Sequence, residues 1–288
     1  MSQFRVLEPF IVGIPSAEAV PEEAASLLVL PRACLQAPEI IYPNRGVNTK
    51  GVQLEINWDN QLTKDLAYFA FPGHKNCLVS GKPLEQTNPS EISMDANLFG
   101  RRCFRLDNVT ATTRIAIDIS DDPYFDTFAG PCSMLGEFAI SSDDGTGMGI
   151  LNLNNNTTYH NLHTVAALNA VDNPFYCQWV TSATFRLQAN ITPAPYSIGS
   201  RWNFVAALAG GSNDLQTLCN NYMAHDVTGS VPTTSYDSFT LGARRFTAGY
   251  VNPLDGGIAW AGLWKRRLSL GEAATMRSNP YQILRLKR

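Results

Sequence analysis

The chain has 288 residues, of which 44% are hydrophobic and 16% are charged. That is enough apolar material for one large domain or two small ones. Lys and Arg number 22 against 25 Asp and Glu, so the sequence lacks the dense basic face that grips nucleic acid. No stretch approaches the ~20 apolar residues of a membrane helix, and the short apolar run at residues 10–14 does not make a secretory signal. We expect a chain that binds neither nucleic acid nor membranes.

Residues 1–45 differ in composition from the rest of the chain. Six prolines recur through this segment, which excludes long helices and central strands. The segment is also more apolar than disordered tails usually are. We predict an extended arm that packs on a neighbouring subunit or on its own domain, although a partly ordered leader remains the alternative. The side chains expected to dock are Phe4, Phe10, Ile11, Leu27, Leu28 and Leu30.

The pattern from residue 46 to residue 288 predicts a single β domain. Apolar and polar residues alternate at 52–58 and 113–119, as they do in half-buried strands. Shorter candidate strands follow, separated by turn clusters rich in Gly, Asn and Asp. About ten strands without intervening helices favour a two-sheet sandwich. The other candidate strands are 103–106, 134–141, 149–153, 158–162, 176–179, 183–188, 202–209, 239–243 and 257–264.

One helix is predicted at residues 270–277, near the C-terminal end. Ser269 is a favourable N-cap, and Glu272 stands three residues later, as in a capping box. Asn279-Pro280 ends the helix, because proline disfavours helical backbone in the residue before it.

Residues 257–274, GIAWAGLWKRRLSLGEAA, resemble the closing strand and helix of concanavalin-A-like and laminin-G-like jelly rolls. Residues 278–284, SNPYQIL, are similar to the ending of the bacteriophage versions of this domain. Residues 54–66 resemble the phage-type opening, although Gln61 and Asp65 replace the usual proline and glycine. Residues 199–207 and 239–243 are similar to two further strands of the family. The resemblance implies an all-β, two-sheet antiparallel jelly-roll sandwich, and it has no counterpart for the N-terminal arm.

Six cysteines are spread through the chain without a Cys-x-x-Cys pair, which argues against zinc-ribbon and redox motifs. A chain of this length builds its own core and needs no disulfide framework. We expect reduced, mostly buried thiols and synthesis in the host cytoplasm. The six residues are Cys34, Cys77, Cys103, Cys132, Cys177 and Cys219.

Catalytic chemistry is not evident in the sequence. Glycosidases of this superfamily need two carboxylates about 5 Å apart, and their Glu-x-Asp-x-x-Glu signature is absent. Glu55 matches the first acid, but Asn57 replaces the second. Loop aspartates at 121, 122, 143 and 144 match no complete calcium loop and are explained by turn formation. We expect no enzyme activity, no catalytic residue, no cofactor and no metal.

The leading functional hypothesis is a structural protein of a bacteriophage virion, in a decoration, fibre or tail-associated role. It would dock on other virion proteins through its arm and form a homo-oligomer. The alternative is a carbohydrate-binding adsorption module for host-surface glycans, and a glycoside hydrolase ranks third. Aromatic rings stack on sugars, so the candidate sugar-contacting residues are Tyr159, Tyr196, Tyr222, Tyr236 and Tyr250.

Overall fold

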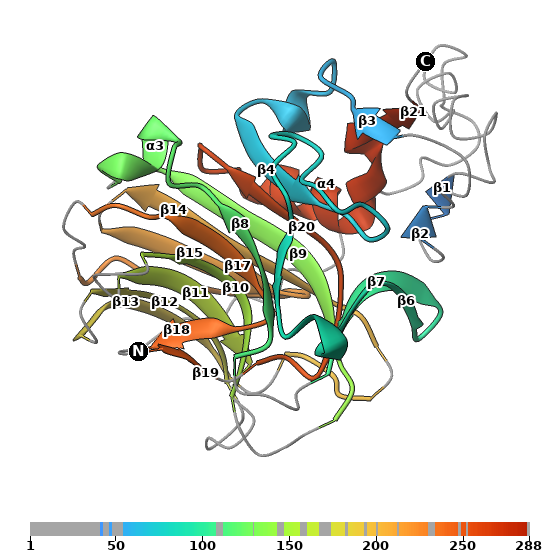
Figure 1. Ribbon diagram of the computed structural model, residues 1–288. Helices are drawn as coiled ribbons and strands as arrows, with labels where there is room; N and C mark the ends of the chain where they lie inside the picture. Colours follow the sequence, from blue (N-terminus) through green and yellow to red (C-terminus); the bar gives the residue numbers. More distant parts are fainter. Residues whose placement is uncertain are drawn as a thin grey trace, which may run out of the picture.

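The computed structural model shows two antiparallel sheets packed as a jelly-roll sandwich (Figure 1). It describes residues 41–42, 46–47, 54–107, 112–128, 130–142, 147–155, 160–166, 174–181, 184–192, 195–199, 201–211, 213–229, 234–246, 249–251 and 253–286. The predicted docking side chains at residues 4–30, and with them most of the arm, lie outside these ranges.

The first sheet has seven strands, and each neighbouring pair is antiparallel. Their spatial order is β13 (Thr184–Ile191), β12 (Phe175–Thr181), β11 (Asn161–Ala166), β10 (Met148–Asn154), β17 (Ser238–Leu241), β8 (Arg114–Asp118) and β5 (Glu85–Thr87).

The second sheet has eight strands and carries the candidate site. Its order is β16 (Tyr222–Asp226), β15 (Asp214–Cys219), β14 (Asn203–Gly211), β9 (Cys132–Ile140), β20 (Gly256–Trp264), β7 (Arg101–Leu106) and β6 (Ile92–Leu98), with β4 (Leu66–Ala70) also paired to β20. Strand β6 is therefore an edge strand, held in the sheet by β7.

Three short strand pairs and five short helical segments complete the described structure. The pairs join β1 (Ile41–Tyr42) to β2 (Gly46–Val47), β3 (Leu54–Ile56) to β21 (Leu284–Leu286), and β18 (Arg244–Phe246) to β19 (Gly249–Val251). The helical segments are η2 (Gln61–Thr63), η3 (Pro89–Glu91), α3 (Pro123–Asp126), α4 (Leu270–Ser278) and η4 (Pro280–Ile283).

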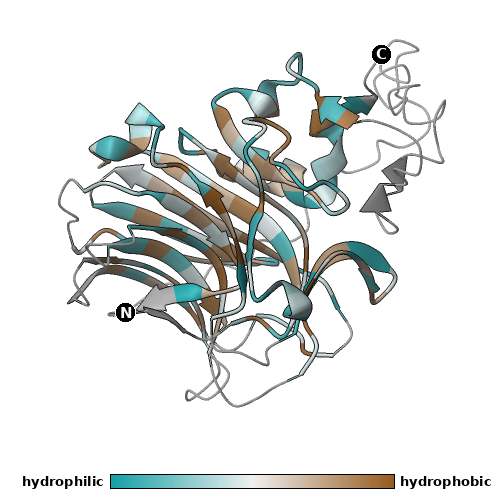
Figure 2. Ribbon diagram, viewed as in Figure 1, coloured by the Kyte–Doolittle hydropathy of each residue, from teal (hydrophilic) through white to brown (hydrophobic). Residues whose placement is uncertain are grey.

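The main core fills the space between the two sheets. Alternate residues of each strand face it, such as Leu151 and Leu153 of β10 and Met134 and Phe138 of β9. This alternation is the period of two that a half-buried strand requires. Figure 2 shows apolar and polar residues following one another along the strands of the sandwich.

A second apolar cluster lies on the outer face of the eight-stranded sheet. Phe69, Leu135 and Trp260 project from this face and pack with Ala273 and Met276 of α4. Helix α4 therefore covers part of the outer face, and the C-terminal segment that follows it closes against β3. The part of the face beside α4 is left for the candidate site.

Most predicted elements are confirmed with shifted boundaries. Helix α4 begins after Ser269, whose hydroxyl oxygen accepts a hydrogen bond from the Glu272 N–H at 3.2 Å, and the capping box is complete. The strand predicted at 52–58 is shorter, because β3 ends at Ile56 and Trp58 lies exposed in a turn. The strand predicted at 158–162 begins instead at Asn161. The β1–β2 pair spans the domain boundary predicted between residues 45 and 46.

Candidate functional site

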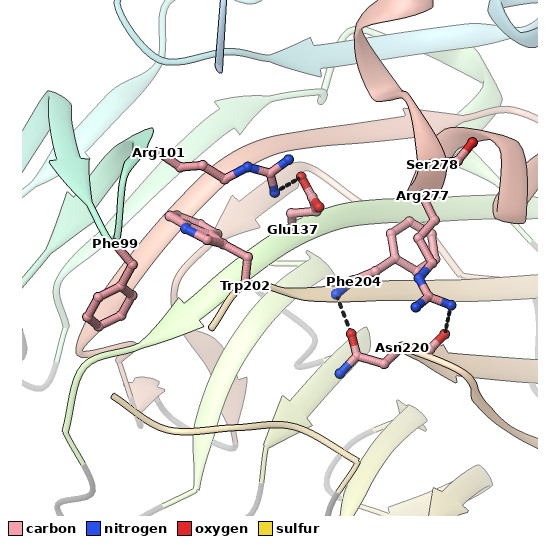
Figure 3. Close-up of a pocket in the computed structure, with 8 residues that line it drawn as sticks. All are labelled: Phe99, Arg101, Glu137, Trp202, Phe204, Asn220, Arg277 and Ser278. Carbon is pink, nitrogen blue, oxygen red and sulfur yellow. Dashed lines mark hydrogen bonds and ion pairs between the residues drawn. The ribbon is translucent and has the colours of Figure 1, made fainter. Parts of the chain in front are cut away.

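A hollow of about 340 Å³ opens on the outer face of the eight-stranded sheet (Figure 3). It lies between the β6–β7 hairpin and the C-terminal end of α4. Strands β9 and β14 form its floor. Its lining residues are Phe99, Arg101, Glu137, Trp202, Phe204, Asn220, Arg277 and Ser278.

A buried ion pair anchors the floor of the hollow. Glu137 in β9 is opposite Phe204 of β14 on one side and Trp260 of β20 on the other. Its carboxylate accepts a hydrogen bond from Trp260 Nε1 at 2.9 Å and pairs with Arg101 Nη1 at 2.7 Å. The side chains of Arg101 and Glu137 are only 11% and 9% exposed. Their charges therefore neutralise each other, as buried charges must.

Trp202, one residue before β14, forms an aromatic wall. The Arg101 guanidinium lies 5.8 Å from the centre of its ring, within the range of a cation–π contact. Gly257 of β20 makes room for the indole, because a Cβ at this position would come within 3.1 Å of the ring and 2.9 Å of Cys103 Sγ. The glycine thus lets a large ring lie against the sheet.

Phe99 occupies the tip of the β6–β7 hairpin. Phe99 and Gly100 form a two-residue loop with φ of 49° and 77°, and Leu98 pairs with Arg101 on either side of it. Two successive positive φ values are typical of a type I′ turn, which favours Asn, Asp or Gly at its first position. For a residue with a side chain, left-handed backbone costs roughly 1–2 kcal/mol. Phe99 is nevertheless 39% exposed.

The opposite wall is built by the β15–β16 turn and by α4. Asn220 adopts left-handed backbone with φ 54°, which asparagine tolerates. Its side chain accepts a hydrogen bond from the Phe204 N–H at 3.0 Å and donates one to Pro195 O at 2.7 Å. Arg277 Nη1 donates to Asn220 O at 2.9 Å and also to the side chain of Asn221. These contacts hold Arg277 at the edge of the hollow.

Arg277 has no carboxylate partner among the residues that the structure describes. The described lining therefore carries two guanidinium groups and one carboxylate. Because Glu137 is already paired with Arg101, no carboxylate of the described lining balances the positive charge of Arg277. Guanidinium groups with free donors bind carboxylates and phosphates strongly.

The three expected sugar-contacting tyrosines whose side chains the structure describes, Tyr196, Tyr222 and Tyr236, are not among the lining residues of this hollow. Tyr236 is 1% exposed, and its hydroxyl accepts a hydrogen bond from Trp179 Nε1 at 2.6 Å. Tyr196 is 9% exposed and packs edge-on against Phe175. Tyr222 is exposed on the edge strand β16. Tyr159 and the side chain of Tyr250 lie outside the described residues.

The burial of Tyr236 and Tyr196 corrects their selection as sugar contacts. Tyr236 serves the core between the sheets, where its ring is out of reach of any ligand. The sequence predicts Trp202 as the first residue of a strand at 202–209, and Phe99, Arg101 and Arg277 were not among the predicted site residues. One local signal was available for Phe99: a Phe-Gly pair between two strand-like segments is an unusual hairpin loop.

The acids considered for hydrolysis do not form a catalytic pair in the described residues. Glu55 pairs with Arg285 at 2.8 Å on the β3–β21 ribbon, away from the hollow. Among the described residues that line the hollow, Glu137 is the single carboxylate. No group of three or more His, Cys, Asp or Glu side chains that could hold a metal ion occurs in the described ranges. Within the same ranges, no helix is long and apolar enough to cross a membrane.

No family model matches the sequence, and no curated protein matches it. Solved structures do match. Trypanosoma rangeli sialidase in complex with sialic acid is 9% identical, with a TM-score of 0.55, over 74% of this chain and 32% of that chain. A mutant of the same sialidase that displays trans-sialidase activity is also 9% identical, with a TM-score of 0.50, over 73% of this chain and 32% of that chain. The CBM40 module of Ruminococcus gnavus IT-sialidase bound to α2,3-sialyllactose is 17% identical, with a TM-score of 0.44, over 59% and 96%.

The chain spans about a third of the length of the trypanosomal sialidases. At these identities the likeness shows a shared β-sandwich fold and nothing of the chemistry. Activity and ligand must therefore be argued from the residues of this chain.

Proposed function

We propose that this chain is a carbohydrate-binding module, and that the hollow between the β6–β7 hairpin and α4 binds an acidic sugar. The observation that carries the proposal is the guanidinium of Arg277, which lacks a carboxylate partner among the described residues and shares a hollow with the aromatic ring of Trp202.

The composition of the hollow suits a sugar. Sugars present an apolar ring face together with hydroxyl groups, so their sites combine an aromatic surface with convergent hydrogen-bonding groups. Trp202 and Phe99 supply aromatic surface, and Asn220, Ser278 and Arg277 supply polar groups. An entirely apolar ligand would remove water from the Arg277 guanidinium without offering it an acceptor, at a cost in free energy.

The charge of the hollow selects among sugars. Arg101 is neutralised by Glu137, whereas Arg277 is held by carbonyl and amide oxygens. A carboxylate on the ligand would complete the coordination of Arg277 by a charge-assisted hydrogen bond. A neutral sugar of the same shape would gain no such bond, so the site should discriminate by charge.

We propose binding without hydrolysis. Retaining and inverting glycosidases both place two carboxyl groups across the scissile bond, and the described lining offers one, which is nearly buried and paired. Incubation with sialyllactose should therefore release no free sialic acid.

The test is titration calorimetry with free sialic acid, 3′-sialyllactose and lactose. Sialic acid and sialyllactose are the sugars in the structures compared above, which makes them suitable first probes. The two acidic sugars should bind, and lactose should bind more weakly by a factor of roughly ten or more, since a hydrogen bond to a charged group contributes about 1.5–3 kcal/mol.

Arg277→Gln should remove this discrimination and weaken the binding of both acidic sugars by a similar factor. Arg285→Gln is the matched control, because Arg285 lies on the β3–β21 ribbon. Equal affinity of Arg277→Gln and the unchanged protein for sialyllactose would exclude Arg277 as the anion contact. Absence of any sugar binding would overturn the proposed function itself.

The predicted role in a bacteriophage virion, with virion proteins as partners and homo-oligomer assembly, stays a prediction. The motif at residues 257–274 folds as β20 followed by α4. This agreement supports a jelly-roll domain, and it does not bear on whether the domain is part of a virion. The two functions are compatible, because a glycan-binding module on a particle would serve adsorption to a host surface.

A further inference from the structure

We propose that the tip of the β6–β7 hairpin is a second contact point, at which Phe99 stacks on the ring next to the acidic sugar. The ligand is then an oligosaccharide of at least two rings rather than a single sugar. This inference rests on the proposed function, since it takes the acidic ring to lie at Arg277.

The backbone at Phe99 is the first argument. Left-handed backbone is uncommon for residues other than glycine, and Asn and Asp are the residue types that tolerate it. The described residues with side chains and positive φ are Asp65, Asn88, Phe99 and Asn220. Three of the four are the tolerant types, and Phe99 is the exception. No local preference explains a phenylalanine at this position.

Burial does not explain it either. Phe99 is 39% exposed, and neither hydrophobic core includes it. The residues of β6 alternate between half-buried and exposed. Figure 1 shows the β6–β7 hairpin curving away from the body of the sandwich. An exposed aromatic side chain at such a tip adds little buried apolar surface to offset the strain of its backbone. Backbone strain of this kind clusters at binding sites.

The position of Phe99 in the hollow indicates how long a ligand must be to contact both Phe99 and Arg277. Figure 3 shows Phe99 at one end of the lining and Arg277 at the other, with Trp202 and Phe204 between them. A ligand whose carboxylate meets Arg277 must extend along the hollow to reach the Phe99 ring. A second pyranose ring linked to the acidic sugar provides that extension and presents an apolar face for stacking.

Phe99→Asn tests the inference, because it places a residue favoured in type I′ turns at the tip and removes the ring. Binding of 3′-sialyllactose and of free sialic acid is measured by calorimetry for the unchanged protein, for Phe99→Asn and for Phe99→Tyr. The unchanged protein should bind the trisaccharide roughly three- to tenfold more tightly than the free sugar, as one aromatic stacking contact allows.

In Phe99→Asn this preference should vanish while the affinity for free sialic acid stays the same. Its melting temperature should rise by about 2–4 °C, because the strain is relieved. Phe99→Tyr should keep the preference, since it keeps the ring. Trp58→Asn is the matched control, an exposed aromatic residue in the turn after β3 and outside the lining of the hollow, and it should change neither affinity.

The outcomes separate the two proposals. If Phe99→Asn keeps the full preference for the trisaccharide, the hairpin contact is wrong and the acidic-sugar site stands. If Phe99→Asn melts at a lower temperature, the premise that the turn is strained is wrong. If the unchanged protein binds neither acidic sugar, the proposed function fails, and the hairpin contact is overturned with it.

Discussion

The ion pair between Arg101 and Glu137 ties the floor of the hollow to the hairpin above it. Arg101 is the first residue of β7, and Glu137 lies in the middle of β9. Strand β20 runs between them in the sheet and supplies Trp260, which donates to the same carboxylate. The pair therefore positions the edge hairpin over the hollow, and its two charges depend on each other for stability.

Removal of one charge should be more damaging than removal of both. Glu137→Leu leaves the Arg101 guanidinium nearly buried without its carboxylate and should lower the free energy of unfolding by about 3–5 kcal/mol. The double variant Arg101→Leu with Glu137→Leu should be less destabilised than Glu137→Leu alone, because no charge is left unpaired. Denaturant unfolding of the single and double variants measures the difference. If the double variant loses as much free energy of unfolding as the two single variants together, Arg101 and Glu137 do not stabilise each other.

The residue scale is where prediction from sequence was weakest. Sugar-contacting candidates were chosen by residue type and by nearness to predicted loops, and that reasoning cannot tell Tyr236 in the core from an exposed tyrosine. The residues of the hollow come from segments far apart in the chain, Phe99 to Ser278. The pairing of strands brings them together, and a single sequence does not reveal that pairing.

At the scale of elements, α4 connects the fold to the site. Its capping box fixes its first turn, and its last turn carries Arg277 and Ser278 to the hollow. The Glu272 carboxylate accepts hydrogen bonds from Arg266 Nη2 at 2.7 Å and from the Ser269 N–H at 2.8 Å. The pKa of Glu272 is lowered from its usual 4.5 to about 2, chiefly by Arg266 and then by Ser269.

This lowered pKa has a defined effect on stability. The unfolded chain takes up a proton at Glu272 near pH 4.5, whereas the folded chain does so near pH 2. The stabilisation is complete above pH 4.5 and is lost as the pH falls through about 2. Glu272→Gln keeps a residue that suits a capping box but removes the charge that pairs with Arg266, so it should lower the free energy of unfolding by roughly 0.5–1 kcal/mol at pH 7. The difference from the unchanged protein should shrink steadily between pH 4.5 and pH 2.

Unfolding curves at a series of pH values check this expectation. Glu85→Gln, at an exposed position of β5, is the control for removing a carboxylate from the surface. A constant difference between Glu272→Gln and the unchanged protein from pH 7 to pH 2 would contradict it.

The long buried strands of the sandwich were predictable from the sequence, and several shorter strands were not. Strands β9, β14 and β20 are buried along most of their length and were all predicted, as was α4 through its capping residues. Strand β6 was missed, although its apolar residues Ile92, Met94, Ala96 and Leu98 alternate with polar ones and are half-buried on one face. Its pairing with β7 is decided by tertiary context, which local propensity does not capture.

The whole molecule divides at the point where β3 pairs with β21. The strands that the structure describes in the two large sheets all follow β3 in the chain, and the described β1–β2 pair belongs to neither sheet. Deletion of residues 2–45 should leave a folded β domain with one cooperative thermal transition. If the virion prediction holds, the truncated protein should fail to enter particles, because the apolar arm would be its anchor.

Circular dichroism melting and an assembly assay test the two halves of this expectation separately. A truncated protein that enters particles normally would remove the arm as the anchor. A truncated protein without a cooperative transition would show instead that the arm belongs to the folded domain.

The pairing of β3 with β21 also decides how the domain responds to mechanical load. Leu54 lies opposite Leu286, and Ile56 lies opposite Leu284. Tension applied through the chain on both sides of the domain would therefore act on the same end of an antiparallel ribbon. The ribbon would open like a zipper, one residue pair at a time, because its hydrogen bonds run along the direction of pull rather than across it. The three pairs would give way first, and the hollow on the eight-stranded sheet would stay unloaded until they had done so.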